Sequence, residues 1–390
     1  MSLPARAERL DDARRRFGDR VDRLGAFFAK CDPLADACVD AFAALPKGQS
    51  QPLVERALAG GHEAVKRDCA PLAELMEAVE HVPPWVDWEA LDRGGELLLR
   101  TGPLGALVLA FRSLVLAYAA PGGNKPLVLS GRLTEQAARR LAETGRFVHA
   151  TCVHGGLRRH ADGFRITVKV RLMHAQMRRL ARRSGQWRPE LWGEPINQHD
   201  MLGTLLVFSI ALLDGLRLVG FRVTDDEADA YVQLWRYSGY LLGLDPELSP
   251  TSEREARRFA DTMSAMQGPP DDDARALVAA LFGPGLGPTH SRAEELARAA
   301  YRRFAMGLSR GLVGDAVADG VGLPDDRFRH AIDALRPGVR AAERVRLASP
   351  LAHRAYVNAG NARWRRVVET GLGAERPEFQ VSTLRGSTPR

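Results

Sequence analysis

The sequence predicts an all-α protein built as a single large helical domain, and three observations support this prediction. Ala, Leu, Arg and Glu are abundant and runs of β-branched residues are rare, a composition that favours helices over strands. Apolar residues recur every three or four positions along most of the chain, which is the period of an α-helix. No linker divides the 390 residues cleanly, and we find no internal repeat with a period of about 20–50 residues.

Composition excludes several classes of protein. The chain is 45% hydrophobic and 26% charged, close to an average globular protein and unlike a disordered chain, a collagen or a disulfide scaffold. The net charge of +7 comes mainly from arginines that are interleaved with Asp and Glu, which indicates a compositional bias rather than nucleic-acid binding. Four cysteines without C-x-x-C spacing fit reduced thiols in a cytoplasmic protein.

The first part of the chain contains four apolar segments with helical spacing. One stripe covers Val21–Leu34 and a second covers Leu72–Val79, after which a Pro-Pro pair is a stop signal. A helix is expected over Glu89–Arg100, and a very apolar one over Leu104–Ala120. The turn sequence Pro-Gly-Gly-Asn at positions 121–124 ends this series of helices.

The next helix is expected over Thr134–His149, with Thr134 as its N-cap. The segment from Phe164 to Leu172 is ambiguous, because its alternating apolar residues also fit a strand. Ile166 and Val170 lie on one helical face, and the sequence that continues, Met-His-Ala-Gln-Met-Arg-Arg, favours a helix. The remaining helices are expected over Met201–Leu218, Asp225–Leu242, Ser252–Met266, Arg292–Met306 and Asp326–Leu335.

Two segments are apolar enough to be compared with membrane spans. Leu104–Ala120 is interrupted by Arg112, and Met201–Leu213 is stopped by Asp214. Both are shorter than the roughly 20 residues that a span requires, so we expect buried core helices and no membrane span. The charged N-terminal stretch has no apolar segment typical of a secretory signal, which again favours a cytoplasmic location.

Common catalytic motifs are absent or occur in the wrong context. The chain has no G-x-G-x-x-G, P-loop or H-E-x-x-H sequence, and no Glu precedes a His by three positions, so a nucleotide cradle, a zincin site and a di-iron bundle are not favoured. The sequence Gly-Leu-Ser-Arg-Gly at 307–311 matches a nucleophile elbow. A helical pattern runs directly into it, whereas an elbow requires a preceding strand, so we interpret it as a chance match.

His174 is the histidine with the most informative surroundings. It lies on an apolar helical face, with Arg171 and Arg178 in register beside it. Burial of an imidazole is costly unless its nitrogens find partners. An iron centre would satisfy one nitrogen and an outer-shell acceptor the other, and the arginines could pair with haem propionates. A core histidine bonded to a backbone carbonyl explains the same residues, and both interpretations stay open at this point.

Two further groups of residues are weak evidence for a functional site when each is taken alone. Arg140 and Thr144 are four positions apart and lie on one face of a helix, as in any amphipathic helix. Asn197 is expected to cap the helix that follows it, which makes His199 a polar residue of the first turn.

Taken in order, these motifs resemble the MpaB-type oxygenase family, which includes the latex clearing proteins, or rubber oxygenases. The motifs are Pro-Gly-Gly-Asn-Lys at 121–125, Arg-x-x-x-Thr at 140–144, Arg-x-x-His-Ala-x-x-Arg at 171–178 and Asn-Gln-x-Asp at 197–200. The resemblance implies a haem-binding oxygenase core at 85–243. It leaves an N-terminal helical region at 1–84 that packs on this core, a C-terminal helical region at 244–372 and a tail at 373–390 that we expect to be disordered.

The resemblance also implies roles for particular residues. Members of the family have a core similar to a globin, bind haem b without a covalent link and use dioxygen. His174 would then be the proximal iron ligand, and Arg171 and Arg178 would support haem binding or local stability. The signature helix near the haem would contribute the catalytic candidates Arg140, Glu143 and Thr144.

The sequence departs from the rubber-cleaving members at two positions. Those proteins have a lysine directly before the threonine, where this chain has Glu143, and an upstream glutamate where this chain reads Gly-Asn-Lys at 123–125. They are also secreted. We therefore expect a small apolar isoprenoid or secondary-metabolite intermediate as substrate. A buried Glu143 facing the iron would have a raised pKa and could accept a proton.

Four hypotheses follow. The first is a haem b-dependent oxygenase that oxidises a substrate or cleaves a carbon–carbon double bond with dioxygen. The second is a non-catalytic protein that carries haem or senses a gas, which would use the same His174 site. The third is an arginine-rich protein that binds nucleic acid, although no helix-turn-helix pattern supports it. The fourth is a helical scaffold without a cofactor.

Overall fold

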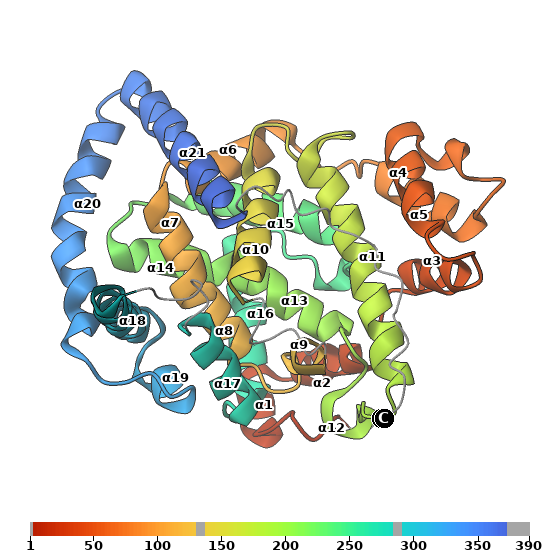
Figure 1. Ribbon diagram of the computed structural model, residues 1–390, viewed down its shortest axis with the longest axis horizontal. Coiled ribbons are helices and arrows are strands. Elements are labelled where there is room, and N and C mark those ends of the chain that lie inside the picture. Colours follow the sequence, from red (N-terminus) through yellow and green to blue (C-terminus); the bar gives the residue numbers. More distant parts are fainter. Residues whose placement is uncertain (1–2, 130–136, 284–290, 373–390) are drawn as a thin grey trace.

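A computed structural model describes residues 3–129, 137–283 and 291–372 of the chain. Within these ranges the regular structure is helical apart from one isolated bridge between Ala7 and Gln267, so the all-α prediction is confirmed (Figure 1). The main core cluster draws buried side chains from all three predicted regions, from Ala13 to Val368. The expected N-cap Thr134 and the expected tail at 373–390 lie outside the described residues.

The N-terminal region contains helices over Leu10–Phe17 and Ser50–Gly60 that were not predicted, and a break in one stripe that was. The stripe over Val21–Leu34 is not one helix, because the chain breaks at Asp32, whose carboxylate accepts a hydrogen bond from the Ala35 amide. Asp32 is thus the N-cap of the next helix, and Pro33 occupies its first position, as is common at helix starts. The elements are α1 (Leu10–Phe17), α2 (Arg20–Gly25), η1 (Ala26–Ala29), α3 (Pro33–Ala43), α4 (Ser50–Gly60), η2 (His62–Ala64) and α5 (Ala70–Glu80).

The centre of the molecule is organised around α6 (Trp88–Leu99) and α15 (Asp225–Leu241), which pack closely along their length. At their crossing, a Cβ on Gly94 would lie 2.4 Å from the Ala230 carbonyl oxygen. Only glycine allows this approach, since real Cβ atoms do not come so near a backbone oxygen. The helix predicted over Asp225–Leu242 is confirmed, and a capping box of Thr224 with Glu227 starts it.

The long helices α10 (Ala137–Cys152) and α11 (Asp162–Arg183) form a hairpin. Figure 1 shows them running down from the loop that joins them, with α9 (Lys125–Leu129) and α13 (Gln198–Phe208) between their lower ends. The helices meet at Gly163, where a Cβ would lie 2.4 Å from the Ala150 carbonyl oxygen. The ambiguous segment around residues 164–172 is helical, as predicted.

The two very apolar segments form broken helices rather than straight ones. The first comprises α7 (Pro103–Val108), a π-helical turn η3 (Leu109–Ser113) and α8 (Leu114–Tyr118). The second continues from α13 through a break at Ser209 into α14 (Ile210–Val219). Gln198–Val219 is long and apolar enough to cross a membrane, and α6 with Pro103–Tyr118 forms a second candidate bent by 86°. In the first candidate 67% of the apolar window is buried inside the protein, as expected of a core helix.

The C-terminal region packs a second, smaller apolar cluster against α8. The sequence Gly-Leu-Ser-Arg-Gly lies inside a helix, where Ser309 is buried and its Oγ donates to the Phe111 carbonyl. It is not a nucleophile elbow, so the chance-match interpretation is confirmed. The remaining elements are α12 (Pro189–Trp192), η4 (Pro246–Leu248), α16 (Glu253–Met266), α17 (Asp272–Leu281), α18 (Arg292–Val313), α19 (Asp315–Gly320), η5 (Arg327–His330), α20 (Ala331–Leu347) and α21 (Pro350–Leu372).

A buried ion network joins the centre to the C-terminal region. The Glu343 carboxylate accepts from Nε and Nη2 of Arg346, at 2.9 and 3.0 Å. Arg100 lies 3.5 Å from the same carboxylate and also pairs with Glu227 on α15. Arg100, Glu343 and Arg346 are all nearly inaccessible to solvent. Two acidic and two basic groups neutralise one another, which makes their burial tolerable.

We expect Glu343→Gln to lower the free energy of unfolding by about 3 kcal/mol, because the change leaves two buried guanidinium groups without their shared carboxylate. Urea unfolding followed by circular dichroism measures the loss. The matched control is Asp272→Asn, which breaks an ion pair in which Asp272 is almost fully exposed, and it should leave the urea midpoint unchanged. Equal midpoints for the two variants would show that the network does not stabilise the fold.

Candidate functional site

His174 lies in the middle of α11 as a half-buried residue with an enclosed Nδ1 atom. This nitrogen has no hydrogen-bond partner, so the alternative of a backbone carbonyl bonded to Nδ1 is not realised. Burial, and then the positive charge of Arg178, lowers the pKa of His174 to about 4. The imidazole is therefore neutral at physiological pH, which is the form that binds a metal ion.

Both arginines beside His174 form ion pairs with the N-terminal region. Arg171 makes a bidentate pair with Asp32, with Nε at 2.7 Å and Nη2 at 2.9 Å from the two carboxylate oxygens. Arg178 Nε donates to Asp36 at 2.6 Å, while its buried Nη2 has no partner. These pairs join α11 to α3, which accords with the expected contribution to local stability. The carboxylates of α3 gave no local signal in the sequence, because they lie about 140 residues away in the chain.

The candidates on α10 lie on the other arm of the hairpin. At about 1.5 Å per residue, Thr144 is about 12 Å from the end of α10 and His174 about 18 Å from the start of α11. By the same measure Arg140, about 18 Å from the end of α10, is level with His174, and Thr144 lies about one helical turn nearer the connecting loop. Glu143 accepts a hydrogen bond from Arg139 Nε at 3.0 Å and is 29% exposed. Arg140 lies near Tyr118 and partly offsets the rise that burial causes in the pKa of its phenol.

The motifs at 121–125 and 197–200 are brought together by Arg6, which the sequence analysis did not single out. Arg6 Nη2 pairs with Asp200 at 2.8 Å and Nη1 donates to the Pro121 carbonyl at 3.1 Å. Asn197 accepts from the Asp200 amide at 2.9 Å, which confirms it as the N-cap of α13. Gly122 has φ +77°, and a Cβ there would lie 2.4 Å from Arg6 Cδ, so the turn requires glycine.

Asn124 and Lys125, at the end of the motif at 121–125, bind to the start of α17. Asn124 is buried and donates from Nδ2 to the Tyr118 carbonyl at 3.2 Å and to Asp271 at 3.3 Å. Lys125 Nζ pairs with Asp271 at 2.9 Å and also with Asp273. Asp271 in turn caps α17 by accepting from the Ala274 amide. These contacts give the motif a structural role that its sequence alone did not reveal.

A cavity of about 130 Å³ lies beside this junction, between α8, α13 and α16. His199 lines it and stacks on Phe28 with ring centroids 3.9 Å apart. Neither ring nitrogen has a hydrogen-bond partner, and burial lowers the pKa of the imidazole. The predicted first-turn position of His199 is correct, but the ring is buried rather than solvated. Asp200 and Arg6 also line the cavity.

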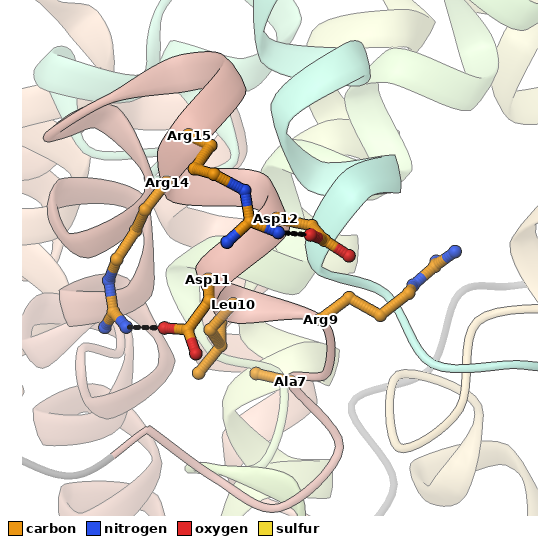
Figure 2. A pocket seen from close by; sticks show the side chains of 7 residues that line it. All are labelled: Ala7, Arg9, Leu10, Asp11, Asp12, Arg14 and Arg15. Atoms are coloured by element: carbon orange, nitrogen blue, oxygen red, sulfur yellow. Dashed lines mark hydrogen bonds and ion pairs between the residues drawn. The ribbon is translucent and has the colours of Figure 1, made fainter.

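A wider hollow of about 560 Å³ lies on the surface at α1 and is shown in Figure 2. Arg9 donates to the backbone carbonyls of Ser264 and Gln267, and the other charged side chains of the lining pair with one another. Arg14 pairs with Asp11 at 3.4 Å, and Arg15 pairs with Asp12. These are exposed ion pairs within one helix, which contribute little energy and leave no unpaired group aimed at a ligand.

The donor set around His174 would suit a haem better than a bare metal ion. In the part of the chain that the structure describes, no group of three His, Cys, Asp or Glu side chains could hold a metal. A bare ion needs several protein ligands, whereas a porphyrin supplies four nitrogens and requires one axial ligand. The unpartnered Nδ1 shows that the ring still has bonding capacity, and the cationic Arg178 beside it could meet a carboxylate. The residues fit the group.

Comparison with known proteins places the chain in a family. The family model described as "ER-bound oxygenase mpaB/B'/Rubber oxygenase, catalytic domain" matches residues 100–347. The rubber oxygenase of Streptomyces sp. (strain K30) is 25% identical over 258 residues, which are 65% of this chain and 60% of that protein. The chain thus matches about three-fifths of the length of this relative.

A solved structure of latex clearing protein in its closed state has the same fold. It superposes with a TM-score of 0.63 at 23% sequence identity, covering 86% of this chain and 88% of the other. His174 and the α10 candidates all lie within the range of the family match.

We expect the free energy of unfolding to decrease as the pH is lowered below about 6.5, in part because of His199. Burial keeps this imidazole neutral in the folded protein, whereas the unfolded chain takes up a proton near pH 6.5. The unfolded state then binds more protons and is favoured as the pH decreases. His199→Phe, which retains an aromatic ring on Phe28, should reduce the loss of stability between about pH 7.5 and 5.5.

Urea unfolding at both pH values tests this expectation. The control His81→Phe changes an exposed histidine and should leave the pH dependence as in the unmodified protein. Asp200 adds a further loss of stability at lower pH, because Arg6 lowers the pKa of the Asp200 carboxyl in the folded protein. An unchanged pH dependence in His199→Phe would contradict the expectation.

Proposed function

Because the chain belongs to the MpaB/rubber oxygenase family, as the match over residues 100–347 shows, we propose that it is a haem b-dependent oxygenase. It would use dioxygen to oxidise or cleave a small apolar substrate of the isoprenoid or secondary-metabolite class. The observation that carries the proposal is the neutral imidazole of His174, whose enclosed Nδ1 has no protein partner and which lies within the matched range.

Bound haem would supply the oxygen chemistry, with His174 as its proximal ligand. The protein contributes a fixed position for that ligand. Asp32 and Asp36 hold α11 through Arg171 and Arg178, one on each side of His174 along the helix. The free Nη2 of Arg178 is the group we assign to a propionate. Arg171 is already satisfied by both oxygens of Asp32, so its role is to position the helix.

On the α10 arm, we assign proton transfer to Glu143. Its carboxylate accepts a hydrogen bond from Arg139 Nε, and it would take a proton from a substrate carbon or from water. Arg140 and Thr144, three positions before and one after it, would orient the reacting groups. Arg140 is level with His174 on the neighbouring helix and Thr144 lies about one turn nearer the connecting loop, which supports this assignment.

The proposed location is cytoplasmic. All four cysteines are free thiols in the structure, and burial raises the pKa of the Cys31 thiol to about 11, so it is unreactive at neutral pH. Free, unreactive thiols suit a reducing compartment.

Protein purified from haem-supplied cells should show a Soret band, and His174→Ala should lose it. The change removes the single axial ligand that we assign to the iron. The matched control is His154→Ala, because the side chain of His154 is 84% exposed, and its spectrum should be unchanged. A colourless unmodified protein that stays colourless with added hemin would refute the proposal. A Soret band without dioxygen consumption on isoprenoid and polyketide panels would indicate a haem carrier or gas sensor instead.

Glu143→Gln should lower turnover by about 10²-fold or more, the usual contribution of a positioned general base, while the Soret band stays in place. Dioxygen consumption under saturating substrate measures the effect. Glu89→Gln, an exposed acidic residue in the first turn of α6, is the control and should retain full activity. Undiminished turnover in Glu143→Gln would remove the residue from the mechanism.

A further inference from the structure

The corner where α20 meets α21 exposes large apolar side chains to solvent. Leu351 is 76% exposed, Val345 57% and Leu347 44%. Figure 1 shows this corner projecting from the body of the molecule, at the upper left. Three exposed aliphatic side chains thus gather at one protruding tip, where they are available to a partner.

The same corner is strongly cationic. From Arg344 to Val368 the chain contains no Asp or Glu. Arg346 is neutralised by Glu343, but Arg344 and Arg354 are exposed and form no ion pair with any residue that the structure describes. The arginines of this stretch are Arg344, Arg346, Arg354, Arg363, Arg365 and Arg366.

The exposed face of α21 continues the surface away from the tip. Its positions recur every three or four residues, so they share one side of the helix. The opposite side is anchored, since Trp364 and Val368 are buried and a Cβ on Gly360 would lie 2.0 Å from the Leu99 carbonyl oxygen. The outer face is therefore not needed for folding. Its stripe consists of Leu351, Arg354, Asn358, Ala362 and Arg365.

We propose that the α20–α21 corner docks on an anionic lipid surface. Val345, Leu347 and Leu351 would enter the boundary between headgroups and acyl chains, and Arg344 and Arg354 would contact lipid phosphates. Protruding aliphatic side chains have no counterpart on a nucleic-acid backbone. A second copy of the chain would face this corner with the same unpaired arginines, and like charges oppose such a contact.

This inference goes beyond the proposed function and does not rest on it. The corner needs neither haem nor turnover, so the variant His174→Ala should bind lipid as the unmodified protein does. A failure of haem binding and a failure of lipid binding are therefore distinguishable.

Co-sedimentation with extruded vesicles tests the proposal. The unmodified protein should partition onto vesicles of phosphatidylcholine with 30% phosphatidylglycerol much more strongly than onto pure phosphatidylcholine, and added salt should weaken the binding. Arg344→Gln and Arg354→Gln should each weaken partitioning about fivefold. The double variant Leu347→Ser with Leu351→Ser should weaken it by about tenfold or more.

Matched controls change residues of the same kind outside α20 and α21. Arg183→Gln, Arg188→Gln and Val82→Ser alter exposed side chains away from α20 and α21 and should leave partitioning unchanged. Absence of binding to the anionic vesicles, or equal losses in test and control variants, would overturn the proposal. A concentration-dependent dimer by light scattering that the Leu347/Leu351 variant abolishes, without lipid binding, would assign the corner to a second copy instead.

Discussion

The position of α11, and with it that of His174, depends on the burial of charge between α3 and α11. Arg171 and Asp32 are both almost inaccessible, and neither could be buried without the other. Gly243 packs directly against this ion pair. Its φ is +80°, and a Cβ at this position would lie 2.5 Å from Asp32 Oδ2. The helix that holds His174 is therefore positioned by the N-terminal region. That region is part of the site's support even though the family match begins only at residue 100.

Local pattern was sufficient to predict most helices and the candidate ligand. The stripes of α5, α6, α15 and α16 begin and end within a few residues of the expected positions, because helical period and caps are encoded locally. The breaks at Asp32 and Ser209 were missed, since an apolar stripe does not reveal where a cap or a bend interrupts it. His174 could be selected from its own helical face. Its role as a metal ligand stays a prediction, as do the catalytic roles of the candidates on α10.

Partners distant in sequence could not be predicted. Arg6 is 194 residues from Asp200, and Asp32 is 139 residues from Arg171, so no periodicity relates them. These pairs change the interpretation of two motifs. Asn197 and Asp200 bind each other and Arg6, and Asn124 and Lys125 bind Asp271. A sequence resemblance built on such residues reports a shared scaffold as much as a shared chemistry.

The π-helical turn at Leu109–Ser113 has a consequence for how this chain can diverge. A π-turn holds one residue more than the α-helix around it, so it rotates every later side chain by about 100°. Val115 owes its buried contact with the α17 and α18 cluster to that rotation, and Arg112 within the turn reaches the Ala211 carbonyl at 2.9 Å. Deletion of a single residue within the turn would restore an α-helix whose later side chains keep their present orientation, whereas the same deletion elsewhere in the helix would rotate them away from their neighbours.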